Sequence, residues 1–310
     1  MSMNQSVLIC DQVAPLLNEI LQKNGLRITY EPEITPEQIK EKIANFDIII
    51  VRSRTKITKD MIDRATQCKI IARVGVGLDN VDVEAAKAKN IRVINAAEGA
   101  MNAVAELVLG LMLSLAREIP RADREIRNGN WLKKDLMGTE LSGKYLGIVG
   151  LGNIGKRLAR LAKGLNMNII GFDVIPIPDD FVREVGLIKA DVDTLISSAD
   201  FISFHVPLTE ETRHLVNLQR ISKMKKNVYL INTSRGEIID EDALYGALKE
   251  KRIAGAALDV FEKEPATGNK LATLPNVVCT PHIGAQTKEA QSLAANIIAE
   301  KIIMILRGVI

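Results

Sequence analysis

The chain has 310 residues, a length at which two hydrophobic cores are more common than one. Its 47% hydrophobic and 25% charged residues give an ordinary globular balance, and the net charge of +3 is spread along the chain without a run of Lys or Arg. We therefore expect no nucleic-acid partner, and no membrane partner either, because the most apolar stretch, 103–116, is too short to cross a bilayer and contains Glu106.

Short apolar runs alternate with helical patterns over the first hundred residues. The predicted strands are 7–10, 47–52, 69–74 and 92–95. Between the first two, Thr35 is followed by Pro36 and Gln38, which is the capping-box pattern at the start of a helix. Alternation of this kind is typical of parallel strands joined by right-handed crossovers.

A second alternating series follows one long helix that the pattern predicts over Asn102–Asn128. The predicted strands of this series are 145–149, 168–172, 201–206, 228–232, 254–258 and 277–280. A final helix is expected over 287–306, with Thr287 as its cap. The chain is therefore predicted to be α/β, with two doubly wound parallel-sheet domains.

The predicted strand at 145–149 runs directly into Gly150-Leu151-Gly152-Asn153-Ile154-Gly155, and a helical pattern begins there. In this context Gly150 permits a tight turn, Gly152 lets the backbone approach a pyrophosphate, and Gly155 lets the helix pack on the strand. Asp173 ends the next strand, where a carboxylate binds both hydroxyls of an adenosine ribose and repels a 2′-phosphate. The pattern predicts a dinucleotide site that takes NAD rather than NADP.

A second glycine-rich stretch, Gly75–Asn80, also follows an apolar run. It lacks the third glycine, and Asp79 stands where a phosphate would sit. We therefore reject it as a dinucleotide loop.

Histidine is the usual acid or base in hydride transfer from an alcohol, and the chain has only three. His214 lies in a polar segment and is expected to be solvated. His205 lies at the end of a predicted strand and His282 directly follows one, and ligands bind at the carboxyl ends of parallel strands. Position alone does not choose between these two.

A cation and a carboxylate stand at similar places. Arg235 lies just past a predicted strand beside Gly236, where its planar fork can reach a substrate carboxylate. Glu264 follows another strand and can orient an imidazole, and Glu262 is an equal candidate on physical grounds alone. No metal site is predicted, because the three cysteines form no CxxC pair and lack ligand spacing.

The segments 150–155, 232–236, 259–265 and 281–285 occur in the order typical of the D-isomer-specific 2-hydroxyacid dehydrogenase family, which the chain resembles over essentially its whole length. The resemblance implies that His282 is the acid and base, Glu264 its carboxylate partner and Arg235 the substrate-binding cation. It implies NAD as cofactor, with the ribose on Asp173. The implied cofactor-binding residues are Gly150, Gly152, Asn153, Ile154, Gly155, Asp173, Val76, Val206, Thr233, Asp259 and Gly284.

The resemblance is sharper toward the branch of the family that acts on 3-phosphoglycerate, in the segments 51–55, 137–141 and 284–291. It implies oxidation of D-3-phosphoglycerate to 3-phosphohydroxypyruvate, a step of serine biosynthesis. The implied substrate-binding residues are Arg52, Ser53, Val74, Gly75, Arg235 and His282. Ala100 stands where many relatives carry Asn, so reduction of glyoxylate, hydroxypyruvate or another small 2-keto acid stays open. A more distant alternative is an NAD-sensing binding protein, as in the corepressor branch.

The family architecture implies a Rossmann NAD domain, 98–283, inserted in a discontinuous flavodoxin-like substrate domain, 1–97 and 284–310. It also implies a homodimer, or a dimer of dimers, in which the helix at 102–128 takes part. We expect buried thiols at Cys10, Cys68 and Cys279 in a reducing, cytoplasmic compartment, since no signal peptide is read at the amino terminus. We expect no serine-sensing domain after Ile310.

Overall fold

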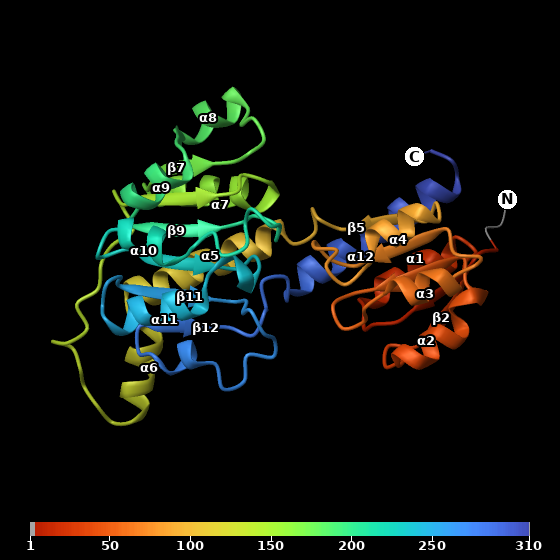
Figure 1. Ribbon diagram of the computed structural model, residues 1–310, viewed down its shortest axis with the longest axis horizontal. Coiled ribbons are helices and arrows are strands. Elements are labelled where there is room, and N and C mark those ends of the chain that lie inside the picture. Colours follow the sequence, from red (N-terminus) through yellow and green to blue (C-terminus); the bar gives the residue numbers. More distant parts are fainter. Residues whose placement is uncertain (1–3, 310) are drawn as a thin grey trace. The chain divides into compact units, whose positions relative to one another are not determined.

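The computed structural model describes residues 4–309 and divides them into two compact units. One unit runs to Met101 and resumes at Ala285, and the other is Asn102–Gly284. The smaller unit is therefore made of two separated stretches of chain (Figure 1). Within residues 4–309, no helix combines the length and the apolarity that crossing a membrane requires.

The smaller unit is built on one parallel five-stranded sheet with the order β2-β1-β3-β4-β5, which is the flavodoxin-like order. Its strands are β1 (Ser6–Ile9), β2 (Arg27–Tyr30), β3 (Ile48–Val51), β4 (Ile70–Arg73) and β5 (Arg92–Asn95). Its helices are α1 (Pro15–Lys23), α2 (Pro36–Lys42), α3 (Lys59–Arg64), α4 (Val83–Ala88) and α12 (Lys288–Leu306), with a 3₁₀ turn η1 (Ile43–Asn45).

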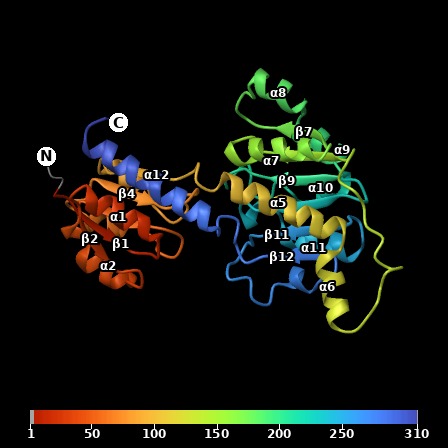
Figure 2. The same ribbon diagram turned by 180° about the vertical axis from the view of Figure 1, so that it is seen from behind.

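Both faces of this sheet are covered, because successive side chains of a strand point to opposite sides. Val7 and Ile9 of β1 pack with α1 and α12, whereas Leu8 packs with α2, α3 and α4. Figure 2 shows α12 lying across the near face of the sheet. Two predicted caps are confirmed: Thr35 and Gln38 form the capping box of α2, and Thr287 accepts from the backbone N–H of Ala290 at the start of α12.

The larger unit has a parallel seven-stranded sheet with the order β12-β11-β10-β9-β6-β7-β8. The strand order reverses beside β6, as it does in the dinucleotide-binding Rossmann fold. The strands are β6 (Tyr145–Val149), β7 (Asn168–Phe172), β8 (Ile188–Lys189), β9 (Phe201–Phe204), β10 (Tyr229–Asn232), β11 (Gly255–Leu258) and β12 (Val277–Cys279). The predicted fold class is confirmed.

Helices again cover both faces of the sheet. They are α5 (Met101–Ala116), α6 (Ile119–Arg127), α7 (Asn153–Gly164), α8 (Asp179–Val185), α9 (Val192–Ser198), α10 (Leu218–Lys223) and α11 (Glu241–Lys249), with 3₁₀ turns η2 (Gly236–Ile238) and η3 (Lys270–Thr273). Ile148 of β6 packs with α5 and α7, and Ile202 of β9 packs with α9, α10 and α11.

Two predictions about local structure were wrong. The single helix predicted over 102–128 is two helices, because Glu118 adopts a left-handed backbone with φ of 49° and Pro120 falls in the first turn of α6. A proline inside a continuous helix would clash with the preceding turn and remove a hydrogen bond. Cys10 and Cys68 are buried as predicted, but Cys279 is exposed at the end of the edge strand β12.

Candidate active site

Sequence-predicted site residues follow six strands of the larger sheet at its carboxyl edge, with Val206 after β9. The strand order places these ends in the sequence β12, β11, β10, β9, β6 and β7. His282 follows β12, Glu264 lies in the loop after β11, Arg235 follows β10, and the glycine loop follows β6. Asp173 follows β7 at the far end of this row. Residues far apart in the sequence are therefore carried by neighbouring strands of one sheet.

The glycine loop requires glycine at two of its three positions. At Gly150 the φ is +95° and an added Cβ would lie 2.6 Å from the carbonyl oxygen of His205. At Gly155 an added Cβ would lie 2.0 Å from the carbonyl oxygen of Gly150, so any side chain would separate α7 from the loop. A Cβ on Gly152, which precedes α7, would meet nothing within 4 Å. The backbone at Gly152 is therefore open to a ligand.

Asp173 ties the loop to the end of β7. Its Oδ2 accepts a hydrogen bond from the backbone N–H of Leu151 at 2.6 Å, and its Oδ1 accepts from that of Ile175 at 2.9 Å. A carboxylate oxygen has more than one acceptor site, so these contacts leave room for hydroxyl donors. This arrangement fits the ribose of a dinucleotide.

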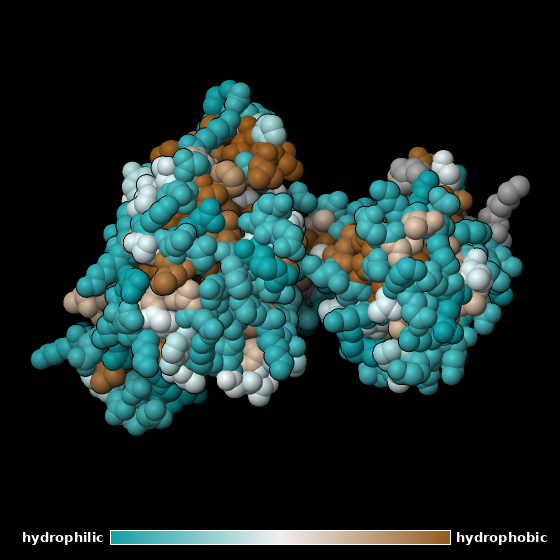
Figure 3. All heavy atoms as spheres, viewed as in Figure 1, coloured by the Kyte–Doolittle hydropathy of each residue, from teal (hydrophilic) through white to brown (hydrophobic). Residues whose placement is uncertain are grey.

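Three further features of the larger unit fit a dinucleotide. The start of α7 offers unpaired N–H groups and a partial positive charge beside Asn153 and Ile154. The Oγ1 of Thr233, just past β10, is buried and has no hydrogen-bond partner within residues 4–309. Hydrophobic side chains gather near α8 (Figure 3), and Val174 and Ile175, which follow Asp173, are 86% and 70% exposed. These features would suit the phosphate, amide and purine groups of a dinucleotide.

His282 and Glu264 form a hydrogen-bonded pair. The Nδ1 of His282 lies 2.9 Å from Oε2 of Glu264, and the Oε1 of Glu264 accepts from the backbone N–H of Phe261 at 3.2 Å. A carboxylate is only an acceptor, so Nδ1 carries the proton and Nε2 keeps its lone pair in the neutral ring. The imidazole is half exposed, at 51% of its side-chain surface, so Nε2 is accessible to a substrate hydroxyl.

The turn that carries His282 is held by Asp259, which is fully buried. Its Oδ1 accepts from Thr280 Oγ1 at 2.6 Å and from the N–H of Ile283 at 2.8 Å, and its Oδ2 accepts from the N–H of Gly284 at 2.9 Å. The backbone of His282 has a φ of +53°, a conformation that only strong local contacts maintain in a non-glycine residue. Asp259 thus fixes the direction of the imidazole.

The hydrogen bonds distinguish the two histidines, and the two glutamates, that sequence position left as equal candidates. Glu262 accepts from Nε2 of His214 at 2.9 Å, not from His282. His205 points back into the sheet, where its Nε2 lies 2.9 Å from the Oγ of the fully buried Ser203. Burial lowers the pKa of His205 from 6.5 to about 4, so this ring is neutral at physiological pH. Of the three histidines, His282 alone is paired with the carboxylate that the family resemblance indicates.

Arg235 lies in a loop that packs against the loop after β11. Its carbonyl oxygen accepts from Nδ2 of Asn232 at 2.8 Å, and Asn232 Oδ1 accepts from the N–H and Oγ of Ser234 at 3.1 and 2.8 Å. An added Cβ on Gly236 would lie 1.9 Å from the carbonyl carbon of Phe261, so the arginine loop touches the backbone of the glutamate loop directly. No role was predicted for Asn232, although an amide at the end of a strand is a signal that the sequence offers.

The other predicted residues belong to the smaller unit, at the carboxyl ends of β3 and β4. Arg52 Nη2 donates to Oε1 of Gln286 at 3.0 Å, and Ser53 is exposed. Val74 is 3% exposed, so a ligand could reach only its backbone. Gly75 has a φ of +155° and lies under the guanidinium of Arg73, and the carbonyl oxygen of Val76 accepts from Nδ2 of Asn95 at 2.5 Å.

Within residues 4–309, no cluster of three or more His, Cys, Asp or Glu side chains could hold a metal ion. The pair of His282 and Glu264 lies at the carboxyl edge of the larger sheet. Along the sheet edge the arginine loop after β10 is its nearest neighbour, and the dinucleotide loop after β6 lies beyond β9.

Comparison with known proteins gives concordant results. Residues 109–284 match the model of the D-isomer specific 2-hydroxyacid dehydrogenase, NAD binding domain. The chain is 47% identical over 303 residues to D-3-phosphoglycerate dehydrogenase of Methanocaldococcus jannaschii, covering 97% of this chain and 57% of that protein. It is 46% identical over 286 residues to hydroxypyruvate reductase of Thermotoga maritima, covering 91% and 92%.

A solved structure of similar fold is D-lactate dehydrogenase of Aquifex aeolicus complexed with NAD and lactic acid. It has a TM-score of 0.84 and 29% identity, and the match covers 98% of this chain and 96% of that one. The chain spans 57% of the length of the D-3-phosphoglycerate dehydrogenases of Methanocaldococcus jannaschii and Archaeoglobus fulgidus.

Proposed function

The chain belongs to the D-isomer-specific 2-hydroxyacid dehydrogenases, and we propose that it catalyses the NAD-dependent oxidation of D-3-phosphoglycerate to 3-phosphohydroxypyruvate. The observation that carries the proposal is the contact between His282 and Glu264 on the sheet edge that also holds the dinucleotide loop. The substrate is supported by similarity to relatives named D-3-phosphoglycerate dehydrogenase in several organisms.

His282 acts as the base in this proposal. Its Nε2 accepts the proton of the C2 hydroxyl, while Glu264 holds Nδ1–H and stabilises the imidazolium that forms. In the reverse direction the imidazolium returns the proton to the carbonyl oxygen. Glu264 does not itself need to take up a proton, because its task is to orient the ring and balance its charge.

Arg235 binds the substrate carboxylate and polarises the developing carbonyl oxygen at C2. A guanidinium suits this task because its fork of N–H donors stays charged and matches a carboxylate in geometry. When bound, NAD⁺ supplies the acceptor for the hydride that leaves C2. The loop Asn232–Gly236, held by the amide of Asn232, keeps the arginine in place.

The cofactor would be held by the residues that the sequence predicted for it. Gly150, Gly152, Asn153, Ile154 and Gly155 would bind the pyrophosphate, and Asp173 the adenosine ribose. The rest of the dinucleotide would be contacted by Val206, Thr233, Gly284 and Val76. Asp259, which is fully buried, would act by holding the turn at Gly284. The orphaned hydroxyl of Thr233 supports this assignment, because a polar ligand group would satisfy it.

Arg52 and Ser53 are assigned to the phosphate of the substrate, with the backbone of Val74 and Gly75 beside them. A phosphate is a doubly charged acceptor, and Arg and Ser are both suited to it. Ala100, where an amide is common in the family, is 3% exposed and offers no side-chain donor. Loss of that donor makes the charge of Arg52 more important for selection of the substrate.

The experiment that tests the substrate compares kcat/KM for three 2-keto acids with NADH. We expect 3-phosphohydroxypyruvate to exceed hydroxypyruvate and glyoxylate by about two orders of magnitude, because charge-assisted hydrogen bonds to a phosphate are strong. Arg52→Gln should remove most of this preference and leave turnover of glyoxylate unchanged. A wild-type enzyme that prefers hydroxypyruvate would overturn the phosphorylated substrate and favour the activity named for the Thermotoga maritima relative.

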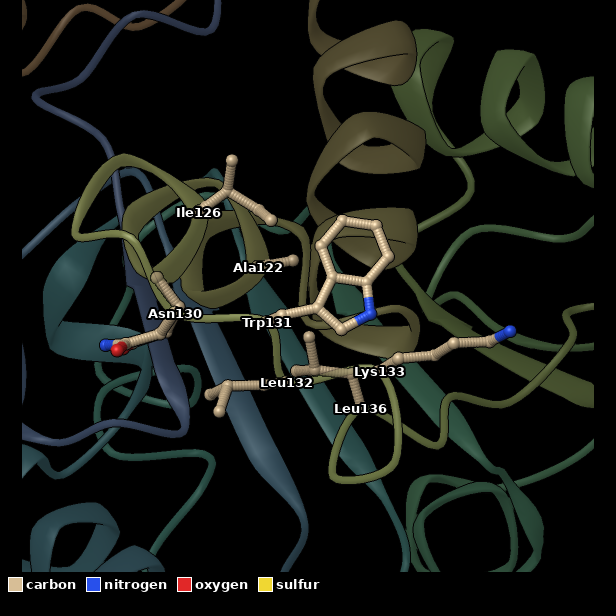
Figure 4. Close-up of a pocket in the computed structure, with 8 residues that line it drawn as sticks. Ala122, Ile126, Asn130, Trp131, Leu132, Lys133 and Leu136 are labelled. Atoms are coloured by element: carbon tan, nitrogen blue, oxygen red, sulfur yellow. The ribbon is translucent and has the colours of Figure 1, made fainter.

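We further propose that the protein is a homodimer that uses α6 and the segment after it. No residue of α6 is buried, and even its apolar residues Ile119 and Ile126 are 49% and 55% exposed. Trp131 and Met137 follow at 79% and 88% exposed, and Figure 4 shows Ile126, Trp131 and Leu136 around one hollow. Exposed apolar surface of this kind is typical of an interface, and a second copy is the partner expected for a two-fold contact.

A cytoplasmic location is proposed on the cysteines. Cys10, Cys68 and Cys279 are all free thiols, which is typical of proteins in a reducing compartment.

A further inference from the structure

The loop Arg52–Thr55 follows β3 and carries the two residues assigned to the substrate phosphate. Its backbone N–H groups do not enter the sheet ladder. Instead the N–H of Arg52 donates to Oδ2 of Asp11 at 2.5 Å, and the N–H of Thr55 donates to the same oxygen at 3.2 Å. The hydroxyl of Thr55 donates to Oδ1 of Asp11 at 2.7 Å. Asp11 is 2% exposed, so one buried carboxylate holds both ends of the loop.

The carbonyl groups of the same loop are held from the other side. Nδ2 of Asn80 donates to the carbonyl oxygen of Arg52 at 3.0 Å and to that of Thr55 at 2.6 Å. Nε of Arg73 also donates to the carbonyl of Arg52 at 3.2 Å. Asp11 therefore binds the N–H groups and Asn80 binds the carbonyl groups, which leaves this short loop little conformational freedom.

The two arginines of the loop have different surroundings. Arg54 forms an ion pair with Asp11, its Nε lying 3.2 Å from Oδ1, and its Nη2 donates to the carbonyls of Cys10 and Pro32 at 2.6 Å each. Arg52 instead contacts the neutral amide of Gln286, which does not cancel its charge. Partial burial lowers the pKa of Arg52 and Asp11 opposes this effect. An anion bound at Arg52 would compensate its lost hydration.

We propose that Asp11, together with Asn80, is a positioning residue that fixes the Arg52–Thr55 loop so that Arg52 and Ser53 are set in advance for the phosphate of the substrate. This rests on the proposed function, since it takes Arg52 and Ser53 as phosphate ligands. A preset loop spares the entropy of ordering these groups on binding, so its loss should appear in KM for the phosphorylated substrate.

The chain provides a matched control at the amino ends of the same two strands, β1 and β3. Asp47 precedes β3, and its Oδ2 accepts from the N–H and the hydroxyl of Ser6, both at 2.9 Å. Like the contact between Asp11 and Arg52, this one joins residues 41 positions apart. Asp47→Asn thus removes a carboxylate that joins the amino ends of β1 and β3, whereas Asp11→Asn removes one that joins their carboxyl ends.

The test combines hydrogen–deuterium exchange with kinetics on the full-length variants. Asn has one acceptor oxygen where Asp11 has two, so Asp11→Asn cannot accept from the backbone N–H groups and from Arg54 Nε at once. We therefore expect the amides of Arg52 and Thr55 to exchange at least about tenfold faster than in wild type. KM for 3-phosphohydroxypyruvate should rise about tenfold, while KM for glyoxylate and Kd for NADH change by less than about twofold. Asp47→Asn should leave these loop amides and all three constants unchanged.

Asn80→Ala is a second variant that keeps the test usable if Asp11→Asn does not fold, and it should show the same separation of constants. Unchanged exchange of the loop amides in both variants would overturn the proposal. So would faster exchange with an unchanged KM for the phosphorylated substrate, or an equal effect in Asp47→Asn. Wild-type enzyme that turns over glyoxylate but prefers it to the phosphorylated acid would instead contradict the proposed function, and the exchange measurement would still decide whether Asp11 and Asn80 hold the loop.

Discussion

Nδ1 of His282 lies 2.9 Å from Oε2 of Glu264, while Glu262, two residues earlier, is bound at the same distance to His214. Two glutamates in one short segment therefore serve two different imidazoles. Because Phe261 and Glu264 also contact each other through the backbone N–H at 3.2 Å, the loop itself sets which carboxylate faces His282. This discrimination gives a direct test of the acid–base assignment.

Glu264→Gln should lower kcat by about 10²-fold, since the amide can hold Nδ1–H but does not balance the charge of the imidazolium. Binding of NADH, measured by fluorescence titration, should be unchanged. Glu262→Gln is the matched control and should retain kcat within about threefold, because its imidazole partner is His214. Equal losses in the two variants would contradict the pairing.

The glycines of α7 make a second test. Gly155→Ala places a Cβ 2.0 Å from the carbonyl oxygen of Gly150, and overpacking of this kind costs roughly 1–3 kcal/mol of unfolding free energy. It should also weaken NADH binding by at least about tenfold, because the loop must move. Gly164→Ala, at the other end of the same helix, meets nothing within 4 Å and should raise stability by up to about 1 kcal/mol. Denaturant unfolding and NADH titration measure both; a Gly155→Ala protein as stable as wild type would disprove the steric account.

The buried His205 should make the free energy of unfolding depend on pH. Its pKa is lowered from 6.5 in the unfolded chain to about 4 in the fold, because burial disfavours the charged ring. The stabilising contribution is therefore fully present above pH 6.5 and is lost as the pH falls toward 4, where the unfolded chain binds the extra proton. The loss amounts to about 3 kcal/mol.

His205→Gln serves as the reference for this measurement, because carboxylates titrate in part of the same range. The unfolding free energy of the wild type minus that of the variant should fall as the pH is lowered from 7 to about 4. A difference that stays constant over that range would show that the ring is not held neutral by burial.

Strand–helix alternation was sufficient to predict both sheets, since apolar runs such as those at 48–51 and 201–204 are buried on both faces. It did not reveal β2 or β8. β2 has no buried residue and β8 is a two-residue edge strand, so neither has the apolar signature on which the prediction rests. The break between α5 and α6 depends on the left-handed backbone of Glu118, which periodicity does not encode.

The site was predicted unevenly for a related reason. Motif and family resemblance indicated the residues that would touch ligands, such as Arg235 and His282. The residues that hold these groups, such as Asp11 and Asn232, act through contacts between segments distant in sequence, with 41 residues separating Asp11 from Arg52. Only the fold brings such pairs together. Choosing Glu264 over Glu262 by physics alone also required the distances to two imidazoles.

The proposed dimer makes a prediction about assembly. Trp131→Asp should convert the dimer to a monomer, because it places a charge on the apolar surface formed by Ile126, Trp131 and Leu136. Sedimentation velocity measures the mass directly. Leu218→Asp is the control, since Leu218 is 56% exposed at the start of α10 and should leave the mass unchanged. A monomeric wild-type protein would contradict the assignment of this surface.

The central claim is that the imidazole of His282 carries the proton of the substrate hydroxyl, and its most direct test is the rate of NADH formation by His282→Asn with 3-phosphoglycerate and NAD⁺. Asparagine can keep a hydrogen bond to Glu264 but cannot accept a proton, so kcat should fall by at least about 10²-fold while Kd for NADH stays at the wild-type value. Turnover within about tenfold of wild type, at unchanged NADH affinity, would show that another group is the base.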